Sequence, residues 1–326
     1  MVTRSRHLLG RSNPVAQRKI WRVLQIVAGL LVIGLAARSI ILNWQSLRTQ
    51  PIEWRFSPGW IALSVLIVFT AYAALIEAWR RVVLSMGESL EFFQATRIWF
   101  LASLGKYVPG KLWAVAGAAI LAQRAGVDPS VAVAGALVLQ ALALSSGAVA
   151  VALTAREAFQ SVGPGVVPIA LVIVATSIAG IVILGSQRLL DRVNRILPAS
   201  LPRLRAVAPA MLAAAFAANL FAWASYGLAL VLLAKGLLPE LHLSLLQAIG
   251  VFTCSYLVGF IAVFAPGGLG PRESVFLLML AGNIGLKPAA ALALASRLLL
   301  TGTEILPALP LLLRRSAANP STVREA

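Results

Sequence analysis

The stretch A-P-G-G-L-G-P-R-E, from Ala265 to Glu273, interrupts an otherwise apolar region near the C-terminus. Its prolines and glycines disfavour a regular helix, because proline lacks a backbone donor and glycine weakens helical structure. Its adjacent Arg272 and Glu273 add charge, which is costly in the hydrocarbon core of a bilayer. Broken backbone at membrane depth is tolerated only where it is buried in protein or lines a wet cavity. We therefore expect a functional site at this stretch.

The composition indicates a polytopic membrane protein. Hydrophobic residues make up 60% of the chain and charged residues 12%, which excludes an ordinary soluble domain. The net charge is +17, but the basic residues fall between apolar runs, as the positive-inside rule expects, so no nucleic-acid binding is expected. The single Cys254 excludes a disulfide framework or a cysteine-based metal site within one chain.

Basic segments between the apolar runs predict the topology. Residues 1–19 carry bases and no acid, which marks them as cytoplasmic. The run 20–42 also suits a signal-peptide core, but no convincing cleavage site follows it, so a retained helix is favoured. The arginine-rich loop 186–206 and the tail 314–326 are expected on the same side. The transmembrane domain is therefore 20–313, in a plasma (inner) membrane with both termini cytoplasmic.

An all-α fold with about six spanning helices is expected. One short polar turn, around Thr154–Pro164, joins two of them, and the second helix ends at Arg80 and Arg81. Glu77 precedes these arginines by three and four residues, which predicts a local ion pair on one helix face. The expected spans are 20–42, 59–79, 130–153, 165–185, 207–235 and 288–312.

Counting back from the cytoplasmic loop, the segment 92–122 begins and ends on the cytoplasmic side. G-K-Y-V-P-G-K (Gly105–Lys111) interrupts it and leaves two arms of about 12–13 residues, roughly 18–20 Å each, which predicts a re-entrant hairpin. The same count makes 244–285 begin and end outside, although its first arm is long enough to span. The predicted hairpin tips are Pro109 and Gly110 in the first segment, and Pro266, Gly267, Gly268 and Gly270 in the second.

The two broken regions match each other in three places, in the same order. Because the number of spans between them is odd, the copies, about 59–153 and 207–312, should have opposite orientations. Inverted repeats with broken helices near the midplane are typical of alternating-access transporters. The alternative is an old duplication kept for folding. The matches pair Leu90-x-x-x-Gln94-Ala95 with Leu243-x-x-x-Gln247-Ala248, Pro109-Gly110-Lys111 with Pro266-Gly267-Gly268, and Gly126–Ser130 with Gly285–Ala289.

Signals for an enzyme are weak. The only aspartates, Asp128 and Asp191, fall in predicted cytoplasmic loops, and His7 and His242 are far apart in the predicted topology. No paired carboxylates, metal-ligand spacing or phosphate-binding glycine pattern is present. No catalytic residue, metal or cofactor is therefore expected.

Charged residues in apolar context are better candidates for function. Lys106 and Lys111 flank the first tip and have no acid in their own segment, so a tip near the midplane would need an anion such as a lipid phosphate. Alternatively, the hairpin is shallow and the lysines snorkel to the headgroups. A structural alternative for the second hairpin pairs Glu273 with Arg297 and Arg272 with Glu304. The candidate substrate-binding residues are Arg97, Lys106, Tyr107, Lys111, Arg272, Glu273, Arg297 and Glu304.

The motifs G-K-Y-V-P-G-K-L-W, A-Q-R-A-G-V and A-P-G-G-L-G-P-R-E, with the Ala-rich helix bearing Arg297, resemble the transmembrane region of lysylphosphatidylglycerol synthases/flippases. The resemblance covers about 59 to 313. It implies movement of a phospholipid between leaflets, whereas a separate soluble domain aminoacylates the lipid in that family. The chain stops at Ala326, so aminoacylation is not expected. Residues that match the family motifs are Lys106, Tyr107, Pro109, Gly110, Pro266, Gly267, Gly268, Gly270, Arg272 and Glu273.

The leading hypothesis is a flippase-like translocase for an anionic phospholipid or lipid-linked precursor, held in a cavity between the two hairpins. A second hypothesis is an accessory or scaffold subunit for a partner membrane enzyme that modifies lipids or glycans. A third, a polyprenyl-dependent glycosyltransferase-like enzyme, is disfavoured by the absence of a D-x-D pattern. Homo-oligomer formation is left open by the sequence.

Overall fold

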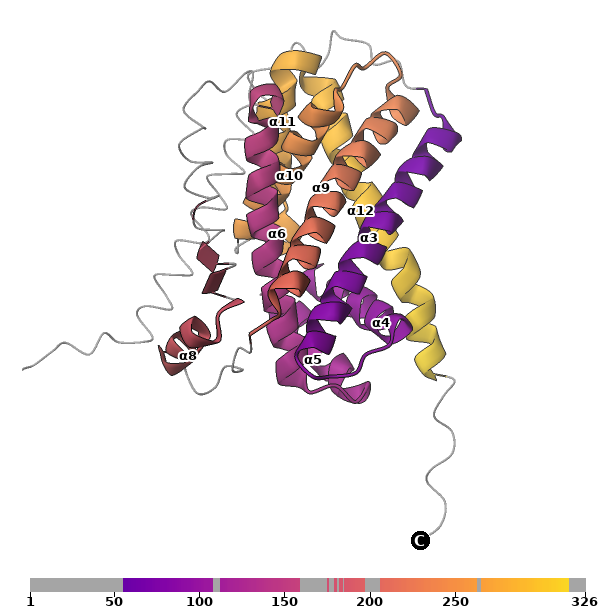
Figure 1. Ribbon diagram of the computed structural model, residues 1–326. Coiled ribbons are helices and arrows are strands. Elements are labelled where there is room, and N and C mark those ends of the chain that lie inside the picture. The colour runs from indigo at the N-terminus through magenta and orange to yellow at the C-terminus, as the bar shows by residue number, and fades with distance from the viewer. Residues whose placement is uncertain are drawn as a thin grey trace, which may run out of the picture.

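In the computed structural model the described chain is almost entirely α-helical, and no strand occurs in it (Figure 1). The described residues are 55–107, 112–158, 175, 179–180, 182–183, 185–196, 206–262 and 265–316. Their elements are α3 (Pro58–Ser85), α4 (Phe92–Ser103), the 3₁₀ turn η1 (Leu104–Tyr107), α5 (Leu112–Arg124), α6 (Pro129–Ala158), α8 (Gln187–Ile196), α9 (Pro209–Leu237), α10 (Leu245–Ile261), the 3₁₀ turn η2 (Pro266–Gly268), α11 (Pro271–Ile284) and α12 (Leu286–Ser316).

Four helices of the described chain, α3, α6, α9 and α12, are long and apolar enough to cross a bilayer. Each coincides with a span expected from the sequence, which confirms an all-α protein with several membrane-spanning helices. The expected span 20–42 lies outside the described residues, as does most of 165–185.

Two sequence expectations about loops were wrong. The turn expected from Thr154 begins later, because α6 continues to Ala158 and the Thr154 hydroxyl donates within the helix to the Ala150 carbonyl at 2.8 Å. The segment 186–206 contains a helix, α8, and is not simply a loop. This helix is amphipathic, because Leu190 is fully buried whereas its three arginines are exposed. These arginines are Arg188, Arg192 and Arg195.

The helices α3 and α9 form a long antiparallel pair (Figure 1). The start of α3 meets the end of α9, where the Ser57 amide donates to the Gly236 carbonyl at 2.9 Å. Further along, the buried Ser64 hydroxyl donates to the Ala229 carbonyl at 2.7 Å. The short helix α4 packs on α3 and the short helix α10 packs on α9, whereas α5 and α11 pack on other helices.

The crossing of α9 and α10 depends on a glycine. A Cβ atom built on Gly227 would lie 2.7 Å from the Cα of Ile249 and 2.8 Å from its backbone nitrogen. Because these neighbours are backbone atoms, rotation of a side chain cannot relieve the overlap. The close approach of α10 to α9 therefore requires the absence of a side chain at residue 227.

Replacing Gly227 by alanine should lower the free energy of unfolding by about 1–3 kcal/mol, because the two helices must move apart. Thermal unfolding of the purified protein in detergent measures the loss. The matched control is Gly302→Ala in α12, where a Cβ meets nothing within 4 Å, so its stability should be unchanged or slightly raised. Equal stability of the two variants would contradict the close crossing.

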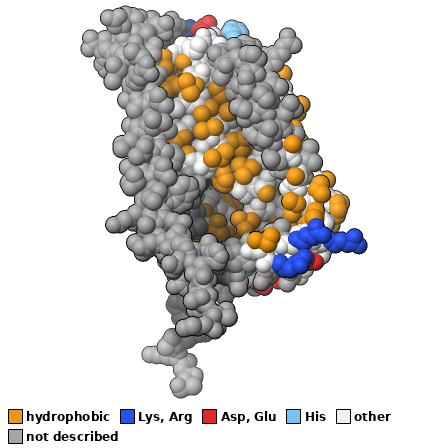
Figure 2. All heavy atoms as spheres, turned by 90° about the vertical axis from the view of Figure 1, so that its left-hand side faces the viewer, with side chains coloured by type: hydrophobic (Ala, Val, Ile, Leu, Met, Phe, Trp, Pro, Cys, Tyr) orange, Lys and Arg blue, Asp and Glu red, His pale blue; other side chains and the backbone are white. Residues whose placement is uncertain are grey.

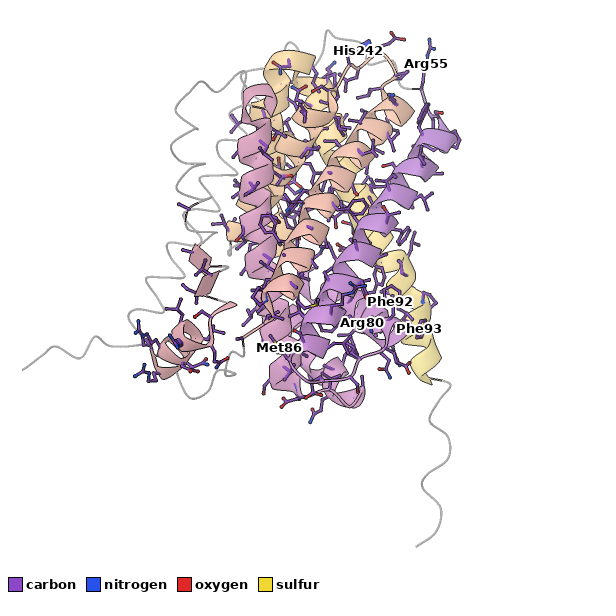
Figure 3. The ribbon with its side chains drawn as sticks, viewed as in Figure 1. Arg55, Arg80, Met86, Phe92, Phe93 and His242 are labelled. Atoms are coloured by element: carbon purple, nitrogen blue, oxygen red, sulfur yellow. The ribbon has the colours of Figure 1, made fainter. Side chains whose placement is uncertain are left out.

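The two interrupted regions approach the middle of the bundle from opposite ends. Met86 and Phe92, beside the start of α4, lie at the lower end of Figure 3, and His242, just before α10, lies at the upper end. The turn η1 follows α4, the turn η2 follows α10, and the two turns are in contact. The arms match the expected boundaries, with 12 residues in α4 and 13 in α5.

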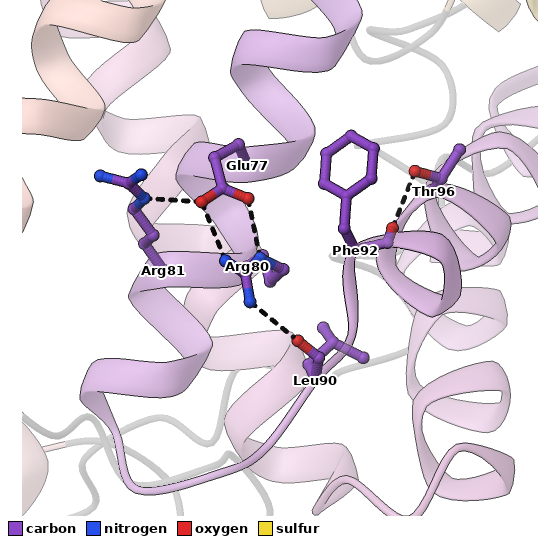
Figure 4. A network of polar contacts seen from close by, with 6 residues as sticks. All are labelled: Glu77, Arg80, Arg81, Leu90, Phe92 and Thr96. Carbon is purple, nitrogen blue, oxygen red and sulfur yellow. Dashed lines mark hydrogen bonds and ion pairs between the residues drawn. The ribbon is translucent and has the colours of Figure 1, made fainter.

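A polar network fixes the entry to α4 (Figure 4). Glu77 accepts hydrogen bonds from Arg80 and Arg81, each with its shortest contact at 2.7 Å, which confirms the expected local pairs. Arg80 also donates through Nη1 to the carbonyl of Leu90 at 3.2 Å. The end of α3 therefore holds the segment that leads into the first interrupted region.

Candidate functional site

A partly buried ion pair joins the first tip to the last helix. Lys106 in η1 places Nζ 2.5 Å from Oε1 of Glu304 in α12, and Glu304 is 7% exposed. The acid for Lys106 thus comes from outside its own segment, where the sequence offers none. The structural alternative that paired Glu304 with Arg272 was wrong, because the ion pair of Glu304 is with Lys106. The partner comes from outside the segment because α4 and α12 pack against each other.

The same carboxylate contacts the middle of α3. The buried Tyr72 hydroxyl donates to Glu304 Oε1 at 3.3 Å and lies 3.3 Å from the Thr303 hydroxyl. Sequence reasoning missed Tyr72 and Thr303, although each is a polar side chain within an apolar run. Glu304 thereby connects α3, η1 and α12.

A second ion pair fixes the second tip to α12. Arg297 donates to Glu273 through Nη1 at 2.7 Å and to the Gly267 carbonyl through Nη2 at 3.1 Å. The other oxygen of Glu273 accepts from the Gly270 amide at 2.8 Å. The Glu273–Arg297 pair predicted from sequence is therefore confirmed. It anchors the η2 turn as well as the helix that follows.

The second tip is a glycine-dependent turn. Gly267, Gly268 and Gly270 have φ values of 58°, 73° and 89°, which L side chains rarely adopt. A Cβ on Gly268 would also lie 2.9 Å from the carbonyl oxygen of Gly259 in α10. The three predicted tip glycines thus let the chain reverse tightly against α10, next to Arg272.

Arg272 is a buried cation on an aromatic surface. The residue is only 7% exposed. Its Cζ atom lies 4.9 Å from the ring centroid of Phe252 and 5.7 Å from that of Tyr256. Its Nη2 atom is buried and has no hydrogen-bond partner in the described chain. Cation–π contacts offset part of the desolvation cost, but an unsatisfied buried guanidinium nitrogen remains unfavourable.

An aromatic layer links Arg272 to the Glu304 pair. The ring of Tyr72 packs edge-on against that of Tyr226, with 6.3 Å between the ring centroids. The ring of Tyr226 stacks on that of Phe252, with 5.1 Å between the centroids. Trp223 contacts both Tyr226 and Tyr256, and its Nε1 donates to Ser146 of α6 at 3.1 Å. This layer was missed from sequence, although Trp223 and Tyr226, like Phe252 and Tyr256, have the spacing of one helix face.

The remaining candidates are less well placed. Arg97 lies on α4 and is partly buried, and no hydrogen bond or ion pair within the described chain joins it to the cluster. Tyr107 ends η1, but its side chain is outside what the structure describes. Also outside are the predicted tip residues Pro109 and Gly110, the cation Lys111 and the side chain of Pro266.

Together these observations define a multi-pass α-helical membrane protein in which two interrupted segments meet beside two partly buried ion pairs and a buried arginine. The family model for the lysylphosphatidylglycerol synthase transmembrane region matches residues 22–307. The chain therefore belongs to this family, and the match starts earlier than the resemblance seen from sequence. No curated protein matches the chain.

Proposed function

We propose that the protein is a membrane lipid translocase that moves an anionic phospholipid or lipid-linked precursor between leaflets. The observation that carries the proposal is the contact between η1 and η2 beside a buried cluster with an unsatisfied guanidinium. The family model supports a lipid-related role in the membrane. In this proposal the protein binds and moves lipid without catalysing a reaction or using a cofactor.

The transport mechanism that we propose uses the two halves of the chain as an inverted repeat. The unit α3–α4–α5–α6 corresponds in order to α9–α10–α11–α12, and α3 runs antiparallel to α9. The lengths are similar except that α10 has 17 residues and α4 has 12. The first short helix of each unit packs against the last helix of the other, α4 on α12 and α10 on α6. Gly126 and Gly285, before the last helix of each unit, have φ values of 82° and 86°. Packing of the short helix of each unit on the last helix of the other is the geometry expected of alternating-access transporters.

Charge distribution sets the proposed orientation. On the face in Figure 2, hydrophobic side chains cover the described surface between the two ends, and Lys and Arg side chains gather toward the lower one. That end carries α8 with its exposed arginines, as well as Arg80. By the positive-inside rule it faces the cytoplasm. The α4–α5 hairpin then enters from the cytoplasm and the α10–α11 hairpin from outside, as two re-entrant segments.

The lipid headgroup would pass the charged cluster while the acyl chains remain in the bilayer. Arg272 and Lys111 attract the phosphate, and the ion pairs of Glu273 and Glu304 hold the two tips on α12. In this mechanism the two tips separate on one side of the membrane at a time, which is the requirement for alternating access.

Replacing Lys111 by alanine should slow translocation of a fluorescent phosphatidylglycerol in proteoliposomes about tenfold, the effect of losing one charge-assisted contact. Reduction of the fluorophore by external dithionite measures the rate. The control is Lys235→Ala in the last turn of α9, whose ammonium lies 5.3 Å from the Trp60 ring centroid, and it should leave the rate unchanged. Equal rates in both variants would contradict the proposed headgroup path. No transport by the wild type, with co-purification of a lipid- or glycan-modifying enzyme, would favour the accessory-subunit function.

A further inference from the structure

We propose that α8 and the start of α9 form a second lipid site, which holds one anionic phospholipid of the leaflet at that end of the bundle (Figure 1). One acyl chain fills an apolar groove beside α9, and the phosphate contacts the arginines of α8. The lipid at this site is a bound ligand and not the transported molecule. The inference therefore goes beyond the proposed function and does not depend on it.

The groove beside α9 is almost wholly apolar. Val182, Gly185 and Ser186 line one side of it, and the first two turns of α9, from Pro209 to Phe216, line the other. Its volume is about 480 Å³, within the range of about 300–1,000 Å³ for ligand pockets. Among the described residues that line it, Ser186 alone has a polar side chain. Because Val182 is 56% exposed, the groove opens to the surface, where an acyl chain can enter it.

Two hydrogen bonds hold this groove next to α8. The Leu190 amide donates to the carbonyl of Ser186 at 2.9 Å, so the first turn of α8 begins at the lining of the groove. The side chain of Gln187 accepts from the Ala206 amide at 3.2 Å, which joins the start of α8 to the segment before α9. A single lipid can therefore contact the groove and α8 at the same time.

The arginines of α8 lie on one helix face, since Arg188, Arg192 and Arg195 follow the spacing i, i+4 and i+7. All three are exposed. The nearby Asp191 carboxylate accepts from Gln187 at 2.8 Å, and within the described chain no acid forms an ion pair with Arg188 or Arg192. A guanidinium matches two phosphate oxygens with parallel hydrogen bonds. Arg188 and Arg192 are therefore available to an anionic headgroup.

The apolar side of α8 sets the depth of these arginines in the membrane. Leu190 on this side is fully buried, whereas Ile196 near the end of the helix is 86% exposed. A helix with one apolar and one basic face lies in the membrane interface, with its basic face at the level of the headgroups. In this position the arginines meet lipid phosphates, and the groove beside them meets acyl chains.

The proposed site is remote from the two tips. Phe216, at the far end of the groove, precedes Trp223 by seven residues of α9, which is roughly 10 Å along a helix. Trp223 is 4% exposed and belongs to the aromatic layer that reaches Arg272, whereas Ala213 in the groove is exposed. A lipid in the groove therefore does not occupy the path between the tips.

The test uses the full chain in phosphatidylcholine vesicles that contain a small fraction of a photoreactive lipid at neutral pH. The probe is either phosphatidic acid or phosphatidylcholine with a diazirine in one acyl chain, and mass spectrometry measures the labelled peptides. Labelling of residues 182–186 and 209–216 is divided by labelling around the lipid-exposed Leu298 of α12. In the wild type this ratio should be about tenfold higher for phosphatidic acid, the effect of two arginines near the membrane surface. Equal ratios for the two probes would refute the site.

The double variant Arg188→Gln with Arg192→Gln tests the headgroup contact. It should lower the ratio for phosphatidic acid to that for phosphatidylcholine. The matched control, Arg81→Gln with Arg124→Gln, removes two exposed cations at the ends of α3 and α5, which lie at the same end of the bundle (Figure 1), and should keep the wild-type preference. An equal loss in both double variants would show that general surface charge attracts the lipid, and this result would overturn the inference.

Gly185→Leu tests the acyl-chain contact. A Cβ on Gly185 lies 3.4 Å from Cδ1 of Leu212, an ordinary contact distance, so the leucine side chain should occupy the groove and lower its labelling by both probes. Wild-type labelling in this variant would show that the acyl chain lies elsewhere, which contradicts the proposed site. If Gly185→Leu does not fold, the two arginine double variants still decide the question. Because labelling requires no transport, a failure of translocation leaves this test intact.

Discussion

Replacing Arg272 by methionine should abolish phosphatidylglycerol translocation in proteoliposomes while the protein stays at least as stable as the wild type. The guanidinium is buried, and its Nη2 lacks a hydrogen-bond partner in the described chain, so its removal eliminates a desolvation cost of about 1–3 kcal/mol. Methionine keeps an apolar contact with Phe252 and Tyr256, although the cation–π attraction of about 0.5–2 kcal/mol is lost. Transport and stability should therefore separate.

Arg272→Lys refines this test. Lysine preserves the positive charge but not the bidentate geometry, so it should transport lipid at an intermediate rate. The control is Arg81→Met, an exposed arginine in the local pair with Glu77, which should transport at the wild-type rate. A methionine variant at residue 272 that unfolds would show that Arg272 is structural, and one that transports normally would remove it from the headgroup path.

Replacing Arg297 by methionine should destabilise the protein by about 3 kcal/mol, toward the lower end of the range for breaking a buried pair. Arg297 and Glu273 have side-chain exposures of 14% and 26%, so solvent screens the pair only in part. The substitution also removes the donor to the Gly267 carbonyl, which weakens the attachment of the η2 turn to α12. Thermal unfolding in detergent should show the loss, and lipid transport should fall with it.

The double variant Arg297→Met with Glu273→Gln separates the loss of the ion pair itself from the cost of leaving one charge unpaired. Because the unpaired carboxylate is also removed, the double variant should be more stable than Arg297→Met alone. Glu77→Gln provides the comparison for a pair within a single helix and should cost about 0.2–1 kcal/mol. Strictly additive losses in the double variant would contradict a coupled Glu273–Arg297 pair.

Local chemistry made part of this architecture predictable. The breaks at Gly105–Lys111 and Ala265–Glu273 follow from proline and glycine within apolar runs, and the arms of the first segment have the expected lengths. The Glu77 pairs follow from helical spacing alone. The Glu273–Arg297 pair was predictable because α12 follows α11 directly in the chain, so the two helices pack as neighbours.

The partner of Lys106 was not predictable in the same way. Glu304 is distant in sequence, and the contact exists because α4 packs on the last helix of the other unit. An ion pair across such a crossing depends on tertiary packing, which spacing within one segment cannot show. The predicted pair of Glu304 with Arg272 was wrong for the same reason. By charge alone, Lys106 and Arg272 are equally plausible partners of Glu304.

Aromatic residues within apolar helices gave an ambiguous signal. Trp223, Tyr226, Phe252 and Tyr256 have the spacing of an ordinary buried helix face, and only the packing of α9 on α10 shows that they form one layer. Tyr72 joins that layer from α3. The layer lies between Arg272 and the Glu304–Lys106 pair, and the pattern of charged residues alone does not predict it.

The central claim is that the two interrupted segments enter the membrane from opposite sides, and sided cysteine labelling tests it most directly. In a Cys254→Ser background, the exposed Ser89 before α4 and the exposed His242 before α10 are each changed to cysteine. A membrane-impermeant maleimide should label His242→Cys in right-side-out vesicles and Ser89→Cys only in inverted ones. Labelling of both cysteines from the same side would contradict the inverted arrangement and the transport mechanism built on it.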